Sequence, residues 1–142
     1  MKMLKLLRPI DKKFKIASGI GERIIFGKKQ MHKGIDFATP VGTKVYAMCD
    51  ARIVKRGWQN PKNKKQGFGI RLMVKFDYEG RKYLAWYTHL SEIFVSPTLE
   101  EIKRGHWIAL TGDTGSSTGP HIHIQALDAE TRQVCDFEWE DA

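Results

Sequence analysis

Residues 112–125 read G-D-T-G-S-S-T-G-P-H-I-H-I-Q, a glycine-rich run of turn-forming residues followed by two histidines one residue apart. His121 and His123 alternate with Ile122 and Ile124. Alternation with period two is typical of a β-strand, in which residues i and i+2 point to the same face. The stretch therefore predicts a strand that presents both imidazoles on one face and buries both isoleucines on the other. Two parallel imidazoles on a rigid strand suit a metal site, or one metal ligand beside a catalytic group.

The composition of the chain indicates one folded, β-rich domain. Its 142 residues are enough for a single hydrophobic core, and 42% hydrophobic residues argue against disorder. Thirteen glycines, five prolines and many short β-type runs favour antiparallel strands. We expect one domain over residues 1–142, with a lead-in strand region at 1–17, a core at 18–125 and a C-terminal tail at 126–142.

The charge of the chain favours an anionic partner, because 24 basic and 16 acidic residues give a net charge of +8. Nucleic acid, a membrane surface and an acidic wall polymer all satisfy this condition. No apolar run approaches the roughly 20 residues of a membrane span. The basic start, interrupted by Lys5 and Arg8, is too short for a signal peptide, and an export segment outside this sequence is the alternative. We expect Cys49 and Cys135 to be unpaired thiols.

Alternating runs and turn signals predict the secondary structure. Strands are expected near 14–17 and over 44–54 (with a turn at 49–51), 67–76, 81–90 and 106–111. A hairpin turn is expected at 77–80, loops at 28–31 and 55–66, a short helical turn capped by Thr98 at 98–103, and a peripheral acidic tail at 136–142. The loop at 55–66 is strongly basic, with five Lys or Arg residues and no acidic one.

His32 and Asp36 lie four residues apart in the stretch H-K-G-I-D. Residues i and i+4 share a face both in a helix and in an extended strand. Gly34 between them, with Pro40 and Gly42 downstream, argues against a helix and allows the backbone to bend. In either conformation we expect the imidazole and the carboxylate to converge.

A zinc site can be assembled from these motifs. His32, Asp36 and His123 would supply two imidazoles and one carboxylate, the three-ligand set of a catalytic zinc whose fourth position is left to water. His89 and His121 would then orient the water, accept its proton or stabilise the oxyanion. The residues alone do not decide which of His121 and His123 is the ligand. Both could bind the metal, with Asp36 as an outer partner.

The remaining histidine, His106, is interpreted as a bystander, because the ligand set is complete without it. The aromatic residues of the same segments have two interpretations, since they would either line a substrate groove or pack in the β-rich core. These residues are Trp58, Phe68, Trp86 and Tyr87.

Four motifs resemble the lysostaphin-type (LytM-like, glycyl-glycine) zinc endopeptidases of bacterial cell walls. They are S-G-I-G-E-R at 18–23, H-K-G-I-D-F-A-T-P-V-G-T at 32–43, W-Y-T-H-L-S at 86–91 and G-D-T-G-S-S-T-G-P-H-I-H at 112–123. They occur in the order found in that family. The resemblance implies a mainly β fold, a single open antiparallel β-sheet with a groove walled by loops and one zinc ion on its floor.

The resemblance also assigns roles. It implies that His32, Asp36 and His123 bind zinc and that His89 and His121 act in catalysis. The implied activity is hydrolysis of stem or cross-bridge peptides of bacterial peptidoglycan by zinc-activated water. A family member that binds the wall or activates another hydrolase without cutting is the alternative, although no site position is substituted. Gln125 stands where the family often has an acidic residue.

The resemblance places the chain at the bacterial cell wall. We expect a monomer and a bacteriophage or prophage lysin, free or virion-associated, with an exported bacterial enzyme as the alternative. The basic loop 55–66 is most simply a solvated surface loop, and in a sharper hypothesis it borders the groove and contacts anionic wall polymers. A nucleic-acid-binding module would not account for the histidines, so we expect no nucleic-acid partner. Both glycyl-glycine bridges and D-alanyl–diamino-acid cross-links lie within the range of the family.

Overall fold

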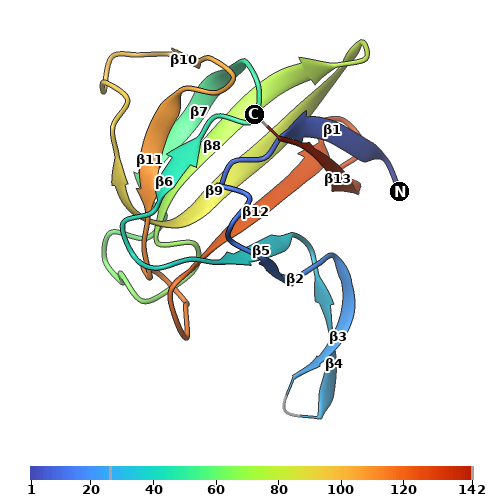
Figure 1. Cartoon of the computed structure of the whole chain (residues 1–142), viewed down its shortest axis with the longest axis vertical. Helices are drawn as coiled ribbons and strands as arrows, with labels where there is room; N and C mark the ends of the chain where they lie inside the picture. The colour runs from blue at the N-terminus through green and yellow to red at the C-terminus, as the bar shows by residue number, and fades with distance from the viewer. Residues whose placement is uncertain (26, 142) are drawn as a thin grey trace.

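The computed structural model describes residues 1–25 and 27–141, and this part of the chain consists of strands and connecting loops without a helix (Figure 1). The strands are β1 (Met3–Leu7), β2 (Ile16–Ser18), β3 (Gly21–Ile25), β4 (Lys28–His32), β5 (Ile35–Ala38), β6 (Lys44–Tyr46), β7 (Ala51–Trp58), β8 (Ile70–Tyr78), β9 (Arg81–Ile93), β10 (Glu101–Ile102), β11 (Trp107–Thr111), β12 (His121–Asp128) and β13 (Val134–Glu140). No helix of the described residues is long and apolar enough to cross a membrane.

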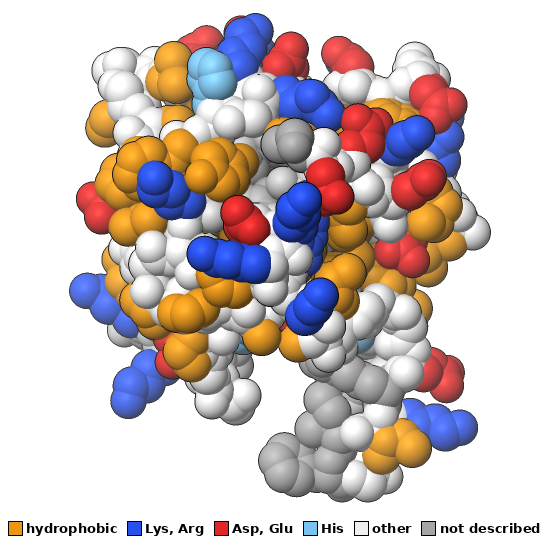
Figure 2. All heavy atoms as spheres, viewed as in Figure 1, with side chains coloured by type: hydrophobic (Ala, Val, Ile, Leu, Met, Phe, Trp, Pro, Cys, Tyr) orange, Lys and Arg blue, Asp and Glu red, His pale blue; other side chains and the backbone are white. Residues whose placement is uncertain are grey.

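One curled sheet contains eleven of these strands, in the order β1-β13-β12-β9-β8-β7-β10 along its main path. On one side β5 pairs with β12 and β2, and on the other β11 pairs with β9 and β6. Neighbouring strands are antiparallel except for β1 and β13, which are parallel. The hairpin of β3 and β4 extends away from the body of the sheet, as the ribbon and the space-filling view both show (Figure 1 and Figure 2). The expected open, mainly antiparallel β-sheet is confirmed.

The core lies against the inner face of the sheet, where the apolar residues that alternate with polar ones along each strand come together. On β12, Ile122 and Ile124 are fully buried, so the predicted division of this strand into an apolar and an imidazole face is confirmed. Tyr87 of β9 is also fully buried, and its hydroxyl accepts a hydrogen bond from the backbone N–H of Met48 at 2.9 Å. The polar atom of this core tyrosine is thereby satisfied, as burial requires.

Three local predictions are wrong because strand pairing decides the conformation there. Residues 28–31, expected as a loop, belong to β4 and pair with β3. Residues 55–58, expected as the start of the loop 55–66, belong to β7 and pair with β8. The helical turn at Thr98 does not form, since Glu101 and Ile102 pair with β7 as the edge strand β10. Ile102 is 2% exposed in this arrangement, so burial of its side chain favours the strand over the capped turn.

The acidic tail was expected to be peripheral, and this prediction is also wrong. Its residues form most of β13, which lies between β1 and β12 in the sheet. Cys135 and Phe137 are buried on its inner face, while acidic residues alternate with them. The period of two places the apolar residues in the core despite the acidic composition. Ala142 lies outside the described residues. Cys49 and Cys135 are free thiols, as predicted.

Candidate active site

An open groove of about 920 Å³ lies where the β5–β12 pair meets the loops that precede β8 and β12. All five residues predicted for the site line this groove, namely His32, Asp36, His89, His121 and His123. Four strands or strand ends therefore contribute to one site. His106 is exposed and does not line the groove, as expected for a bystander.

Strand register sets the position of two of these residues. In the antiparallel pair of β5 and β12, Asp36 lies directly opposite His123. Gly34, just before β5, gives the imidazole its space, because a Cβ at this position would lie 2.6 Å from Cε1 of His123. The bend that the sequence predicted at Gly34 is thus a close approach of backbone to ring. Any side chain there would push His123 out of place.

The ligand atoms of His32, Asp36 and His123 lie within 4.8 Å of one another. Nδ1 of His123 is 2.8 Å from Oδ1 of Asp36 and 3.2 Å from Nε2 of His32. Nε2 of His32 is 3.3 Å from Oδ2 of Asp36. The three side chains thus point inward at a common centre, and all three are largely withdrawn from solvent.

The outer nitrogen of each imidazole has its own partner. Nδ1 of His32 lies 2.8 Å from the carbonyl oxygen of Gly19 and 3.1 Å from Oγ of Ser18. Nε2 of His123 lies 2.8 Å from Oε1 of Gln125. When the outer N–H groups donate to these oxygens, the inner nitrogens carry lone pairs. The tautomers of both rings are therefore set for binding a cation.

The donor set fits a divalent metal ion. While no cation is bound, Nδ1 of His123 and Oδ1 of Asp36, 2.8 Å apart, share a hydrogen-bond proton, and a divalent ion would take the place of this proton. Burial acts to raise the pKa of Asp36, but its hydrogen bond and charge interaction with His123 outweigh this and hold the pKa below the usual value. The carboxylate is therefore ionised at neutral pH. Two histidines and one carboxylate are a ligand set of catalytic zinc.

His89 sits in a constrained backbone conformation beside this centre. Its φ is +55°, which is uncommon for a residue with a side chain. Its N–H donates to the carbonyl of Phe68 at 2.8 Å, and its Nδ1 lies 2.6 Å from the carbonyl oxygen of Thr114. Burial lowers the pKa of His89. The ring is therefore neutral at pH 7, with Nδ1–H donating to the backbone.

His121 is held in the same manner. Its Nδ1 lies 2.8 Å from the carbonyl oxygen of Gly119 and 3.2 Å from Oγ of Ser117. The ring centroids of His89 and His121 are 4.7 Å apart. Within the described chain neither Nε2 has a hydrogen-bond partner, so in the tautomer that donates Nδ1–H each ring keeps Nε2 as an available acceptor.

Two loops interlock to form one wall of the groove. Gly69 and Gly115 both have positive φ, and a Cβ on Gly115 would lie 2.3 Å from the backbone nitrogen of Gly69. Thr114 links the same loops, since its Oγ1 accepts from the N–H of Ile70 and donates to the carbonyl of Leu90. Because Thr114 also accepts from His89, the loop contact fixes that imidazole.

Sequence reasoning singled out Gln125 but did not identify the other partners that orient the histidines. Gln125 lies two residues after His123 and so on the same face of β12, where it contacts Nε2 of His123. Phe68 and Thr114 carry no such signal, since only the fold brings them to His89. Of the four aromatic residues considered, Phe68 lines the groove, where it stacks on His123 with a centroid distance of 5.9 Å. Tyr87 belongs to the core.

Comparison with known proteins gives a consistent result. The profile of peptidase family M23 matches residues 30–134. The peptidoglycan DD-endopeptidase ShyA of Vibrio cholerae is 33% identical over 122 residues, which cover 84% of this chain and 26% of that protein. Lysostaphin of Staphylococcus simulans is 37% identical over 98 residues, which cover 68% of this chain and 18% of that protein. The chain thus spans about a quarter or less of the length of these curated relatives.

Solved structures show the same similarity. A zinc-containing peptidase from Vibrio cholerae matches with a TM-score of 0.71 at 33% identity, covering 90% of this chain and 37% of that one. The catalytic domain of lysostaphin from Staphylococcus simulans matches with a TM-score of 0.70 at 31% identity, covering 87% of this chain and 89% of that one. The fold of this chain therefore corresponds to that of a peptidase catalytic domain.

Proposed function

Because the chain belongs to peptidase family M23, we propose that it is a zinc-dependent endopeptidase that hydrolyses the peptide part of bacterial peptidoglycan. One observation carries the proposal: three inward-pointing ligand atoms and two further imidazoles share one open groove. The relatives support the substrate class, since ShyA is a peptidoglycan DD-endopeptidase and ALE-1 of Staphylococcus capitis is a glycyl-glycine endopeptidase.

In this proposal zinc is held by His32 through Nε2, by the carboxylate of Asp36 and by His123 through Nδ1. When bound there, zinc supplies Lewis-acid chemistry, which polarises the scissile carbonyl and makes water more acidic. The protein contributes the fixed tautomers of the two imidazoles, through Gly19 and Gln125, and an ionised carboxylate. These outer hydrogen bonds orient the ligands before any metal arrives.

His89 and His121 would carry the proton transfers. Each ring donates Nδ1–H to a backbone carbonyl, so its Nε2 can accept a proton from the attacking water. The imidazolium formed in this way has an Nε2–H that stabilises the oxyanion of the tetrahedral intermediate. The same proton then passes to the leaving amine, which completes cleavage of the peptide bond. The lowered pKa of His89 favours this role, since the ring begins neutral.

The proposed setting is the bacterial cell wall. We treat residues 1–142 as one catalytic domain, active as a monomer, in a bacteriophage or prophage lysin or in an exported bacterial enzyme. The stem or cross-bridge peptide would lie along the groove, with its scissile bond at His32, Asp36 and His123. Anionic wall polymers would contact the basic loop beside the groove. All five site residues are present, which argues against a member that only binds the wall.

Digestion of purified cell walls tests the proposed function. The zinc-loaded protein should release soluble muropeptides from walls, a chelator should abolish release, and added zinc should restore it. Mass spectrometry of the products from walls with glycine bridges and from walls with direct cross-links identifies the bond that is cut. Absence of release from every wall type by zinc-loaded protein would reject the proposed activity.

A further inference from the structure

The segment of residues 51–76 has an unusual charge; it comprises β7, the following loop and β8 as far as Phe76, just before Asp77, the acidic residue of the β7–β8 hairpin. It contains no acidic residue and eight basic ones, Arg52, Lys55, Arg56, Lys62, Lys64, Lys65, Arg71 and Lys75. The sixteen basic residues elsewhere are equal in number to the sixteen acidic residues, so the segment 51–76 carries a charge equal to the whole formal net charge of +8, and the complete hairpin with Asp77 carries +7. The positive charge of the protein is therefore concentrated on two adjacent strands and their loop.

Internal ion pairs do not neutralise this charge. Within the described parts of the chain, none of the eight side chains lies within 4.0 Å of a carboxylate. Arg56 and Arg71 donate to backbone carbonyls, among them those of Val95 and Gly57, and are half-buried. The other six are exposed. An exposed row of unpaired cations is a surface for an anionic partner.

One end of the hairpin borders the catalytic groove. Gly67 and Phe68, in the loop between the two strands, line the groove itself. Backbone hydrogen bonds join this loop to the glycine-rich turn, since Gly115 donates to the carbonyl of Lys64 at 3.0 Å and Ser116 donates to that of Gly67 at 2.8 Å. The loop is thus a hydrogen-bonded rim of the groove, on which Lys62, Lys64 and Lys65 are exposed.

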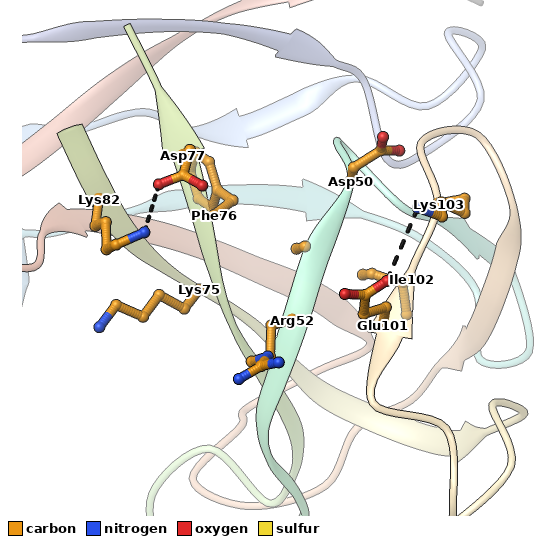
Figure 3. A pocket seen from close by; sticks show the side chains of 10 residues that line it. Asp50, Arg52, Lys75, Phe76, Asp77, Lys82, Glu101, Ile102 and Lys103 are labelled. Atoms are coloured by element: carbon orange, nitrogen blue, oxygen red, sulfur yellow. Dashed lines mark hydrogen bonds and ion pairs between the residues drawn. The ribbon is translucent and has the colours of Figure 1, made fainter. Parts of the chain in front are cut away.

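The other end of the hairpin forms a second cationic group, beside a cavity of about 390 Å³ (Figure 3). Arg52 and Lys75 lie directly opposite each other across β7 and β8, an arrangement that costs stability in the isolated chain. Two of the three carboxylates that line the cavity pair with lysines, Asp77 with Lys82 at 2.7 Å and Glu101 with Lys103 at 3.9 Å (Figure 3). The third, Asp50, accepts a hydrogen bond from the backbone N–H of Arg104 at 2.9 Å. The two cations are left available to a ligand.

We propose that the β7–β8 hairpin is a docking ridge for a linear, phosphate-containing polymer of the bacterial wall. The eight residues of β7 span about 26 Å at about 3.3 Å per residue, so the ridge suits an extended polyanion better than a single ion. This inference rests on the proposed function for the presence of a wall. A polymer held along the ridge would keep the adjoining groove against the wall between cleavage events.

The same surface is poorly suited to nucleic acid. Single-stranded nucleic acid is bound by cations together with aromatic rings on which bases stack. On this hairpin, Nζ of Lys64 lies over the ring of Trp58 at 5.1 Å, and Phe68 is stacked against His123 inside the groove. The aromatic rings of the hairpin are therefore already in contact with other side chains, and the ridge offers charge without a stacking platform.

Sedimentation with purified walls tests the proposal independently of catalysis. The full chain carrying His121→Ala, which blocks hydrolysis, provides the background. The test variant adds Lys62→Gln, Lys64→Gln and Lys65→Gln. The control variant adds Lys5→Gln, Lys12→Gln and Lys15→Gln, which removes the same charge from exposed sites outside the hairpin. Walls are used untreated or after acid removal of their phosphodiester polymers, and a single-stranded oligonucleotide serves as a competitor.

At low salt the test variant should bind untreated walls about tenfold more weakly, while the control changes less than about twofold. The difference in binding between the test and control variants should vanish on stripped walls and at about 1 M salt, where the screening length is about 3 Å. Equal binding by the test and control variants would overturn the proposal, as would a difference that persists on stripped walls. Displacement by the oligonucleotide at lower concentration than by free wall polymer would reject the chosen occupant.

A second measurement separates this inference from the proposed function. With His121 restored, the test variant should hydrolyse a short uncharged peptide substrate with unchanged kcat/KM and should digest untreated walls more slowly. Failure of the wild type to hydrolyse any wall would count against the proposed function and would leave the charge-dependent binding standing. Normal hydrolysis by the wild type, together with wall binding that does not depend on charge, would overturn the docking-ridge proposal and leave the proposed function standing.

Discussion

Asp36 and His123 face each other directly across β5 and β12, with 2.8 Å between Oδ1 of the carboxylate and Nδ1 of the imidazole. Their contact is therefore fixed by the register of two hydrogen-bonded strands. A slip of one residue would turn either side chain to the opposite face of the sheet. The metal-binding geometry is in this way tied to the burial of Ile122 and Ile124, which holds the register of β12.

Separate roles are predicted for His32 and His121. His32→Ala removes an inward-pointing nitrogen, so we expect loss of stoichiometric zinc together with loss of activity. His121→Ala leaves the three ligand atoms in place, and we expect zinc near one equivalent with activity reduced about 100-fold or more. Elemental analysis of both purified variants, alongside wall digestion, measures the split. Equal loss of zinc from both would show that the division between ligands and catalysts is wrong.

Gln125 is predicted to set the metal affinity through His123. Gln125→Leu removes the acceptor at 2.8 Å from Nε2, so the ring is no longer held with Nδ1 toward Asp36. We expect zinc affinity to fall about 10- to 100-fold, as for other outer partners of metal ligands. Competition with a fluorescent chelator measures this without using activity. Gln125→Glu keeps an acceptor oxygen and is the matched control, expected to bind zinc at least as tightly as the wild type.

The thiols are predicted to be inert. Burial raises the pKa of Cys49 to about 12 and also raises that of Cys135. Because the thiolate is the reactive form and a raised pKa lowers its fraction at any pH below that value, both should alkylate slowly at pH 8. We expect two thiols per chain to react after unfolding and neither to react quickly before. Rapid modification of the folded protein, or loss of activity on reduction, would contradict the prediction.

The sequence predicted the strands with a clear local pattern, and the site, better than the strands that depend on long-range pairing. His121, His123 and their isoleucine neighbours were predictable, because period-two alternation is a local property of the chain. The hairpin turn expected at 77–80 was predictable from its turn-forming residues, which are also a local signal, and the structure places it at Glu79 and Gly80. β10 and β13 were missed, since their pairing with distant strands overrides composition and local propensity.

In the site, too, features with a local sequence signal were predictable and features that depend on distant contacts were not. The motifs indicated which side chains converge, and the structure brings them into one groove. The orienting groups of His89, the carbonyls of Phe68 and Thr114, were not predictable, because backbone atoms carry no sequence signature and come from two separate loops. The positive φ of His89 likewise follows from tertiary constraints and not from residue type.

Gly115 provides the sharpest test of whether the interlocked loops position His89. Gly115→Ala places a Cβ 2.3 Å from the nitrogen of Gly69, at a φ of +78°, so the two loops must separate. Gly80→Ala is the matched control, since its φ is +80° but nothing lies within 4 Å. The control should lose about 1 to 2 kcal/mol of stability from backbone strain alone and keep full activity. Gly115→Ala should lose about 1 to 3 kcal/mol more from the clash.

Because Thr114 moves with Gly115, we also expect kcat to fall about 100-fold while zinc remains bound. Denaturant unfolding, elemental analysis and wall digestion of the two variants measure these three effects separately. Full activity in a folded Gly115→Ala protein would show that the loop contact is not what holds His89 in place.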